Sequence, residues 1–217
     1  ENTAQFVAGY PANNVLLAGD RGTGKSSTVK ALVNEFGDRG LRLIELSKEH
    51  LRDLPQVYAA IRGRPERFIL FVDDLSFEED DAEYKALKAV LEGGVEARPA
   101  NLLVYATSNR RNLIRERFSD REALDDDPQR RDTYEEKLSL VDRFGIRVLF
   151  LAPEQERYVQ IATTLAERAG INLPREEIRE RAIYWARAHN GRSGRTARHF
   201  VNALLGELGL QSHSAKE

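Results

Sequence analysis

The chain contains no cysteine and no methionine among its 217 residues. Without cysteine there can be no disulfide, no thiolate metal ligand and no thiol nucleophile. The four histidines, at positions 50, 189, 199 and 213, lack any HExxH-type spacing, so we expect no zinc site. No apolar run approaches the roughly 20 residues that a membrane span needs, and there is no signal-peptide core. We therefore expect a cytoplasmic protein without a membrane partner. Because even an initiator methionine is missing, we expect a piece of a longer protein with its N-terminal region truncated.

The chain also has no large excess of positive or negative charge. Lysine and arginine number 33 and aspartate and glutamate 35, for a formal net charge of −2. This balance excludes a general polycation, so any contact with nucleic acid must come from a local patch. The hydrophobic share of 41% is enough for a folded core of one domain, or of a domain with a small partner.

Five short apolar runs alternate with helical patterns in the first 150 residues, which is typical of an α/β fold with a parallel sheet. Apolar residues at i, i+3, i+4 and i+7 predict one helix over Val29 to Phe36 and another over Tyr84 to Leu91. Several runs are apolar on both faces, as expected of central parallel strands. The predicted strands are residues 15–18, 41–46, 68–72, 102–106 and 146–150.

The pattern changes after Pro153, where three helical stripes follow and no strand is predicted. We expect Trp185 to pack in the core of this small helical domain and Ser193 to cap its last helix. Residues 110–136 are charged and interrupted by DDDP, which predicts a long insertion or loop. The three stripes are Tyr158, Ile161, Ala162, Leu165 and Ala169; then Ile178, Ala182, Trp185 and Ala186; then Ala197, Val201, Leu204, Leu205 and Leu208.

A phosphate-binding loop follows the first predicted strand. Residues 19–26 fit G-x-x-x-x-G-K-[ST] and open the first predicted helix, which is the context that this motif requires. The glycines let backbone amides curl around phosphates, and the helix N-terminus adds its positive dipole. Lys25 brings a positive charge to the phosphate oxygens, and the Ser26 hydroxyl helps to hold Mg²⁺. The predicted nucleotide-binding residues are Gly19, Asp20, Arg21, Gly22, Thr23, Gly24, Lys25, Ser26 and Ser27.

An acidic pair follows the third predicted strand. Asp73 and Asp74 lie at its carboxyl end, where ligands bind in open α/β sheets. Asp73 is expected to hold the water shell of Mg²⁺, and Asp74 to orient or polarise the attacking water. Acidic pairs are common in loops, but a full strand–helix unit separates this pair from Lys25. That spacing favours a motor-type ATPase over a small nucleotide kinase.

With these residues the chain resembles the AAA+ ATPases over nearly its whole length. The runs PANNVLLAGDRGTGKSS, FVDDLSFE, YATSNRR, EKLSLVDRFG and SGRTARHF are similar to a bacterial AAA+-type ATP-binding family of unknown function. The resemblance implies a five-stranded parallel P-loop NTPase sheet of order 5-1-4-3-2 and a C-terminal three-helix lid. The implied boundaries are 1–152 for the α/β core and 153–217 for the lid. The segment that contacts adenine in this class lies upstream of the first strand, where only residues 1–12 remain.

Three further site residues follow from the resemblance. Asn109 follows the fourth predicted strand at the sensor 1 position, where it would bind the γ-phosphate or the attacking water; a capping asparagine in a turn is the alternative. Arg143 stands where AAA+ proteins carry an arginine finger that reaches a neighbouring subunit, although a surface ion pair with Asp142 is the alternative. Arg198, with Arg195 as the second choice, corresponds to the sensor 2 arginine that opens the last helix.

The implied activity is ATP hydrolysis with Mg²⁺ at the interfaces of a homo-oligomer, as a ring or open ring that remodels a macromolecule. Three biological functions of such a protein remain open. The arginines at 110, 111, 115, 117 and 121 would suit a DNA-acting initiator or helicase loader. Phe77 is a weak candidate for the pore loop of a protein remodeller. The third is a nucleotide-dependent switch that binds ATP with little turnover and acts as an interaction module. Separately, Asp74 stands where this class more often carries glutamate, a departure that bears on the rate of hydrolysis.

Overall fold

The computed structural model describes residues 1–75, 88, 91, 97–109, 139–189 and 191–214. This part of the chain divides into two compact units. One consists of Glu1–Gly19 and Lys25–Phe150 and holds the sheet; the other consists of Asp20–Gly24 and Leu151–Glu217 and holds the C-terminal helices. The short segment of the phosphate loop from Asp20 to Gly24 thus makes its contacts mainly with the helical unit.

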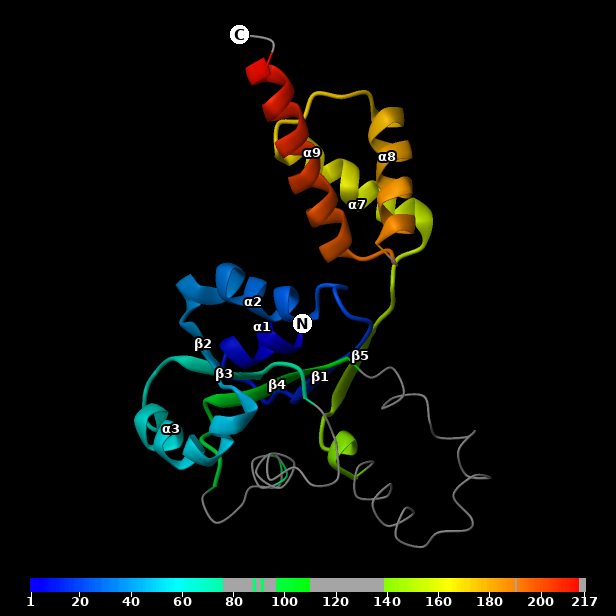
Figure 1. The fold of residues 1–217 in the computed structure, drawn as a ribbon. Coiled ribbons are helices and arrows are strands. Elements are labelled where there is room, and N and C mark those ends of the chain that lie inside the picture. Colours follow the sequence, from blue (N-terminus) through cyan, green and yellow to red (C-terminus); the bar gives the residue numbers. More distant parts are fainter. Residues whose placement is uncertain (76–87, 89–90, 92–96, 110–138, 190, 215–217) are drawn as a thin grey trace, which may run out of the picture. The chain divides into compact units, whose positions relative to one another are not determined.

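The first unit is built on a five-stranded parallel sheet (Figure 1). The strand order is β2-β3-β4-β1-β5, which confirms the order that the resemblance implied. Every residue of β1 and β4 is buried, as their apolar sequences predicted, whereas the edge strands β2 and β5 are partly exposed. The strands are β1 (Val15–Gly19), β2 (Leu41–Glu45), β3 (Arg67–Val72), β4 (Leu102–Ser108) and β5 (Ile146–Phe150).

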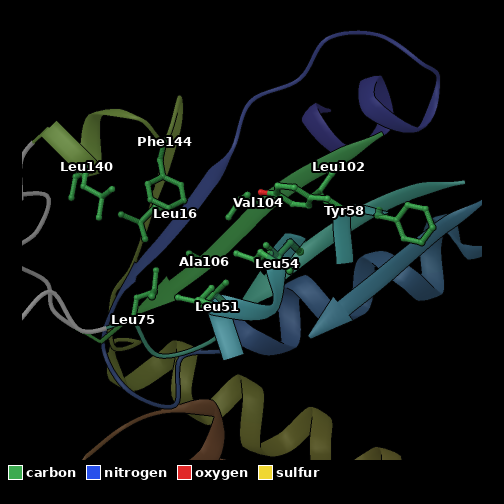
Figure 2. Packing of buried hydrophobic residues seen from close by; sticks show 14 of the residues in the cluster. Leu16, Leu51, Leu54, Tyr58, Leu75, Leu102, Val104, Ala106, Leu140 and Phe144 are labelled. Carbon is green, nitrogen blue, oxygen red and sulfur yellow. The ribbon is translucent and has the colours of Figure 1, made fainter. Parts of the chain in front are cut away.

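Two hydrophobic clusters lie on the two faces of this sheet. Successive side chains of a strand point to opposite faces. Leu16 and Leu70 therefore join one cluster, with Tyr58 and Phe144 (Figure 2). Leu17 joins the other, with residues of the first two helices. The described helices that pack in this unit include α1 (Asn2–Val7), α2 (Lys25–Phe36) and α3 (Leu54–Ile61), with short 3-10 turns at Gly37–Arg39 and Lys48–Asp53.

Three helices make up the C-terminal part of the second unit: α7 (Gln155–Arg168), α8 (Arg175–Ala188) and α9 (Gly194–Ser214). Their shared core contains Tyr158, Ala162, Ile178, Ala182, Ala197, Phe200, Val201 and Leu204, and Trp185 packs against it as predicted.

One member of the predicted third stripe is wrong. Leu205 is 41% exposed, whereas its neighbour Leu204 is buried. The next residue of an α-helix points about 100° further round the axis, and at this place on α9 the core includes Leu204 but not Leu205. Phe200 occupies the buried position one turn before Leu204 instead.

Several expectations fall outside the described residues. They concern most of the helix predicted over Tyr84 to Leu91, the long loop at 110–136 with its arginines, and Phe77. In the part of the chain that the structure describes, none of the helices is long and apolar enough to cross a membrane.

Candidate nucleotide-binding site

The phosphate loop opens with a position that only glycine can fill. Gly19 ends β1 with φ +134, and a Cβ there would lie 1.9 Å from the carbonyl oxygen of Phe150 in the adjacent strand β5. Gly24 has φ +101, again a conformation that side chains disfavour. These two glycines allow the chain to leave the sheet and enter α2 within a short loop.

The middle of the loop contacts residues around α9 within the helical unit. The Gly22 carbonyl accepts a hydrogen bond from the backbone N–H of Arg195 at 3.3 Å. A Cβ on Gly22 would lie 2.8 Å from the Ser193 hydroxyl oxygen, so a side chain has no room. The Asp20 carboxylate accepts a bond from the N–H of Ala152 at 2.6 Å. Asp20 is the second residue of the loop, which the motif leaves unspecified, and it ties the loop to the backbone of Ala152.

Lys25, the first residue of α2, is 5% exposed. Its Nζ donates to the Gly19 carbonyl at 3.0 Å and to Asn109 Oδ1 at 2.9 Å. Gly19 and Asn109 are neighbours because β1 and β4 pair in register, with Ala18 opposite Ser108. The ammonium group is thus held where the phosphate loop meets the carboxyl end of β4.

The predicted Mg²⁺ ligands lie side by side. Ser26 Oγ donates to Asp73 Oδ1 at 2.7 Å, and Thr107 Oγ1 donates to the same carboxylate oxygen at 2.5 Å. Mg²⁺ prefers oxygen ligands and takes only one or two carboxylates, keeping waters and substrate phosphates as its other ligands. A hydroxyl and a carboxylate at this spacing fit that donor set.

Asp74 is held in a turn by β4. Its φ of +56 is the only positive value of a non-glycine residue in the described part of the chain. The Asp74 N–H donates to Thr107 Oγ1 at 2.9 Å, and its carboxylate accepts a bond from Asn109 Nδ2. Because Asn109 also accepts from Lys25, its amide joins the phosphate-loop lysine to the second acid of the pair.

Thr107 is the site residue to which sequence reasoning gave no role. It precedes Asn109 by two positions in β4, which lies next to β3. The implied strand order, with β3 beside β4, was the signal that could have paired Thr107 with the acids.

The three predicted arginines, Arg143, Arg195 and Arg198, are exposed. Arg143 follows the helical turn that contains Leu140, and Asp142 forms an ion pair with Arg147 at 3.0 Å. Arg195 and Arg198 are exposed at the start of α9, and of the two it is the backbone of Arg195 that reaches the phosphate loop. Among the loop residues predicted to bind nucleotide, Arg21 and Ser27 are exposed.

A parallel sheet of this order, with a phosphate-loop motif after β1 and an acidic pair after β3, defines an α/β P-loop NTPase fold of the AAA+ type. The chain resembles a point mutant of Thermotoga maritima RuvB with a TM-score of 0.64 and 16% identity. It resembles the RuvB Holliday junction branch migration motor of that organism with a TM-score of 0.60 and 17% identity. Each match covers 97% of this chain and 60% of the RuvB chain, so this chain spans about three fifths of RuvB. At such identities the likeness shows the fold.

The chain belongs to the family described as "Protein of unknown function (DUF815)", whose model matches residues 1–208. A search of curated proteins found no match. The family resemblance noted from the sequence is thereby confirmed, as an AAA+-type fold within a family of unassigned role.

Proposed function

We propose that this chain binds ATP with Mg²⁺ and hydrolyses it as an AAA+ ATPase. The observation that carries the proposal is the set of contacts from Lys25 through Asn109 to Asp74, beside the Ser26–Asp73 pair. These groups are the ones that phosphoryl transfer needs: a cation for phosphate, oxygens for a metal ion, and a carboxylate for water. They come from the start of α2 and from the residues that directly follow β3 and β4.

Each residue has a defined task in this proposal. Lys25 would exchange its contacts with Gly19 and Asn109 for oxygens of the β- and γ-phosphates. Ser26 and Asp73 would hold Mg²⁺, which neutralises charge that develops on the phosphate oxygens. Asp74 would accept a hydrogen bond from the attacking water, and the Asn109 amide would orient that water or the γ-phosphate.

A homo-oligomer, as a ring or an open ring, would complete the site, with Arg143 supplied by the neighbouring copy. An arginine supplied in trans is worth roughly 10³–10⁵ in rate in other NTPases. Sensor 2 would be Arg195 or Arg198, and the contact between Gly22 and the backbone of Arg195 supports Arg195. The remodelled partner would be a protein or DNA; the RuvB neighbour is described as a branch migration motor, which makes DNA one candidate.

The first test is ATP binding by the Lys25→Ala variant, measured by isothermal titration calorimetry with Mg²⁺. We expect binding to fall at least about a hundredfold, because a charge-assisted contact to phosphate is lost. The matched control is Lys30→Ala on the same helix, whose ammonium is exposed and paired with Glu45 at 2.9 Å. This control should bind ATP normally. Unchanged affinity in Lys25→Ala, with a native circular dichroism spectrum, would refute the nucleotide site.

Turnover distinguishes the hydrolysing protein from a switch. If the wild-type chain binds ATP and its activity per subunit rises with protein concentration, hydrolysis at shared sites is supported. Tight binding without turnover at any concentration would instead favour the switch. Stimulation by DNA that weakens with salt would identify a nucleic-acid partner, and stimulation by unfolded polypeptide would identify a protein partner.

A further inference from the structure

The helical unit contains a cavity of about 290 Å³ that has no part in the proposed ATPase chemistry. Its volume is at the lower end of the range for small-molecule sites. The residues that line it come from the start of α7, the end of α8 and the segment before α9, and include none of residues 19–26. They include Gln155, Tyr158, Ile183, Ala186, Arg187 and Arg192.

Tyr158 gives this cavity a polar group in need of a partner. Its side chain is 0% exposed, and its hydroxyl has no hydrogen-bond partner among the described residues. Leaving a buried hydroxyl without a hydrogen-bond partner is unfavourable. Burial raises the pKa of Tyr158 to about 12, so at neutral pH the hydroxyl keeps its proton and can donate it.

The two arginines of the cavity, Arg187 in α8 and Arg192 after it, differ from the other arginines of α8. Arg175 pairs with Glu167, Arg179 with Glu156, and Arg181 with Glu207. In the described part of the chain, no ion pair or hydrogen bond to the guanidinium of Arg187 or Arg192 is found. The cavity therefore combines two guanidinium groups with no carboxylate among its lining residues.

We propose that this cavity binds a compact organic anion, whose carboxylate or phosphate group pairs with Arg187 and Arg192 while its apolar body packs on Ile183 and Ala186. Arginine recognises both kinds of anion through two parallel N–H donors. Ile183 and Ala186 supply apolar contact that a bare inorganic ion would not use. Gln155, with an amide that both donates and accepts, can bind a polar substituent of the same ligand.

The test is a titration of the ¹⁵N-labelled chain with benzoate and with phenyl phosphate, followed by amide chemical shifts in NMR spectra. We expect saturable shifts at residues 155–158, 183–187 and 191–192. Saturation by one anion alone would identify the charged group that the site prefers. Benzamide, which has the shape of benzoate without its charge, and inorganic phosphate, which has charge without an apolar body, should bind at least about tenfold more weakly.

Variants separate this site from the phosphate loop. Arg187→Ala and Arg192→Ala should each weaken binding about tenfold or more, and Tyr158→Phe by a smaller factor. Arg175→Ala removes an equal charge from the same helix at a paired position and should bind normally. Lys25→Ala should also bind normally, so the outcome is independent of the ATP site.

Two results would overturn the proposal. One is the absence of saturable shifts with either anion up to about 10 mM. The other is an Arg187→Ala/Arg192→Ala double variant that binds both anions as the wild type does.

Discussion

At the scale of single residues, the geometry of the acidic pair depends on Thr107. Its hydroxyl donates to Asp73 Oδ1 and accepts the N–H of Asp74, and its backbone carbonyl accepts the N–H of Leu75 at 2.8 Å. Three consecutive residues after β3 are therefore tied to one residue of β4. This explains how Asp74 is held at a positive φ that costs free energy elsewhere.

Thr107→Val tests that role, because it keeps the shape and removes the hydroxyl. The Asp74 N–H loses its acceptor in a site where Thr107 is 2% exposed, so we expect a loss of about 1–3 kcal/mol in the free energy of unfolding. Turnover should fall more than ATP affinity, since Asp74 is displaced while Lys25 stays. Urea unfolding followed by circular dichroism, together with calorimetry, measures both effects.

The control for this substitution is Thr164→Val, the same change at an exposed position of α7. It should alter stability by less than about 0.5 kcal/mol. Equal stability and turnover in Thr107→Val and wild type would show that the acids are held without the hydroxyl.

At the scale of elements, the ends of helices follow local rules that sequence reveals. Ser193 Oγ accepts the N–H of Thr196 at 3.0 Å, so the predicted N-cap of α9 is confirmed. Gly170, just after α7, has φ +75, the left-handed conformation common after a helix. The prediction that Leu205 faces the core was wrong, because packing against two other helices, rather than hydrophobicity alone, selects which leucine is buried.

Ser193→Ala should lower the free energy of unfolding of the helical unit by about 1 kcal/mol, because α9 loses a capping bond. Trp185 is the only tryptophan of the chain and lies in this unit. Its fluorescence during urea unfolding therefore reports on these helices. Ser193→Thr keeps a capping hydroxyl and should recover most of the loss. If both variants unfold like the wild type, the cap does not stabilise α9.

At the scale of the whole molecule, the proposed ATP site needs Arg143 from a second copy of the chain. Arg143 is exposed, and Asp142 forms an ion pair with Arg147 at 3.0 Å. An arginine on the surface near the start of β5 is suited to act on another copy.

Arg143→Ala is expected to leave ATP affinity unchanged and to lower turnover by about 10³-fold or more. Arg147→Ala removes an exposed, paired charge nearby and should keep most of the activity. Steady-state ATPase assays over a range of protein concentrations make the comparison.

A mixing experiment then tests action in trans. Lys25→Ala cannot bind ATP but retains Arg143, whereas Arg143→Ala binds ATP but lacks the finger. Each alone should be inactive, and their mixture should recover part of the activity. Failure to recover, with both variants still assembling with wild type, would assign Arg143 another role.

The sequence predicted the elements better than the site. The strand at 68–72 and the phosphate loop could be found because a buried strand is continuously apolar and a phosphate loop requires glycines at fixed spacing. Strand order did not follow from these local patterns; it came from family resemblance. Asn109 was placed at a strand end, but its contact with Lys25, 84 residues away, was not foreseen.

By itself, then, the sequence determined the α/β class, the strands, the helix caps and the nucleotide motif, because each depends on residues that are neighbours in the chain. Only the tertiary structure decided that the Thr107 hydroxyl joins two acids, that Asp20 anchors Ala152 and that Tyr158 is buried beside two arginines. Those contacts depend on which strand ends and helix ends meet in space. A hydrogen bond forms within about 3 Å, a distance that no spacing along the chain specifies.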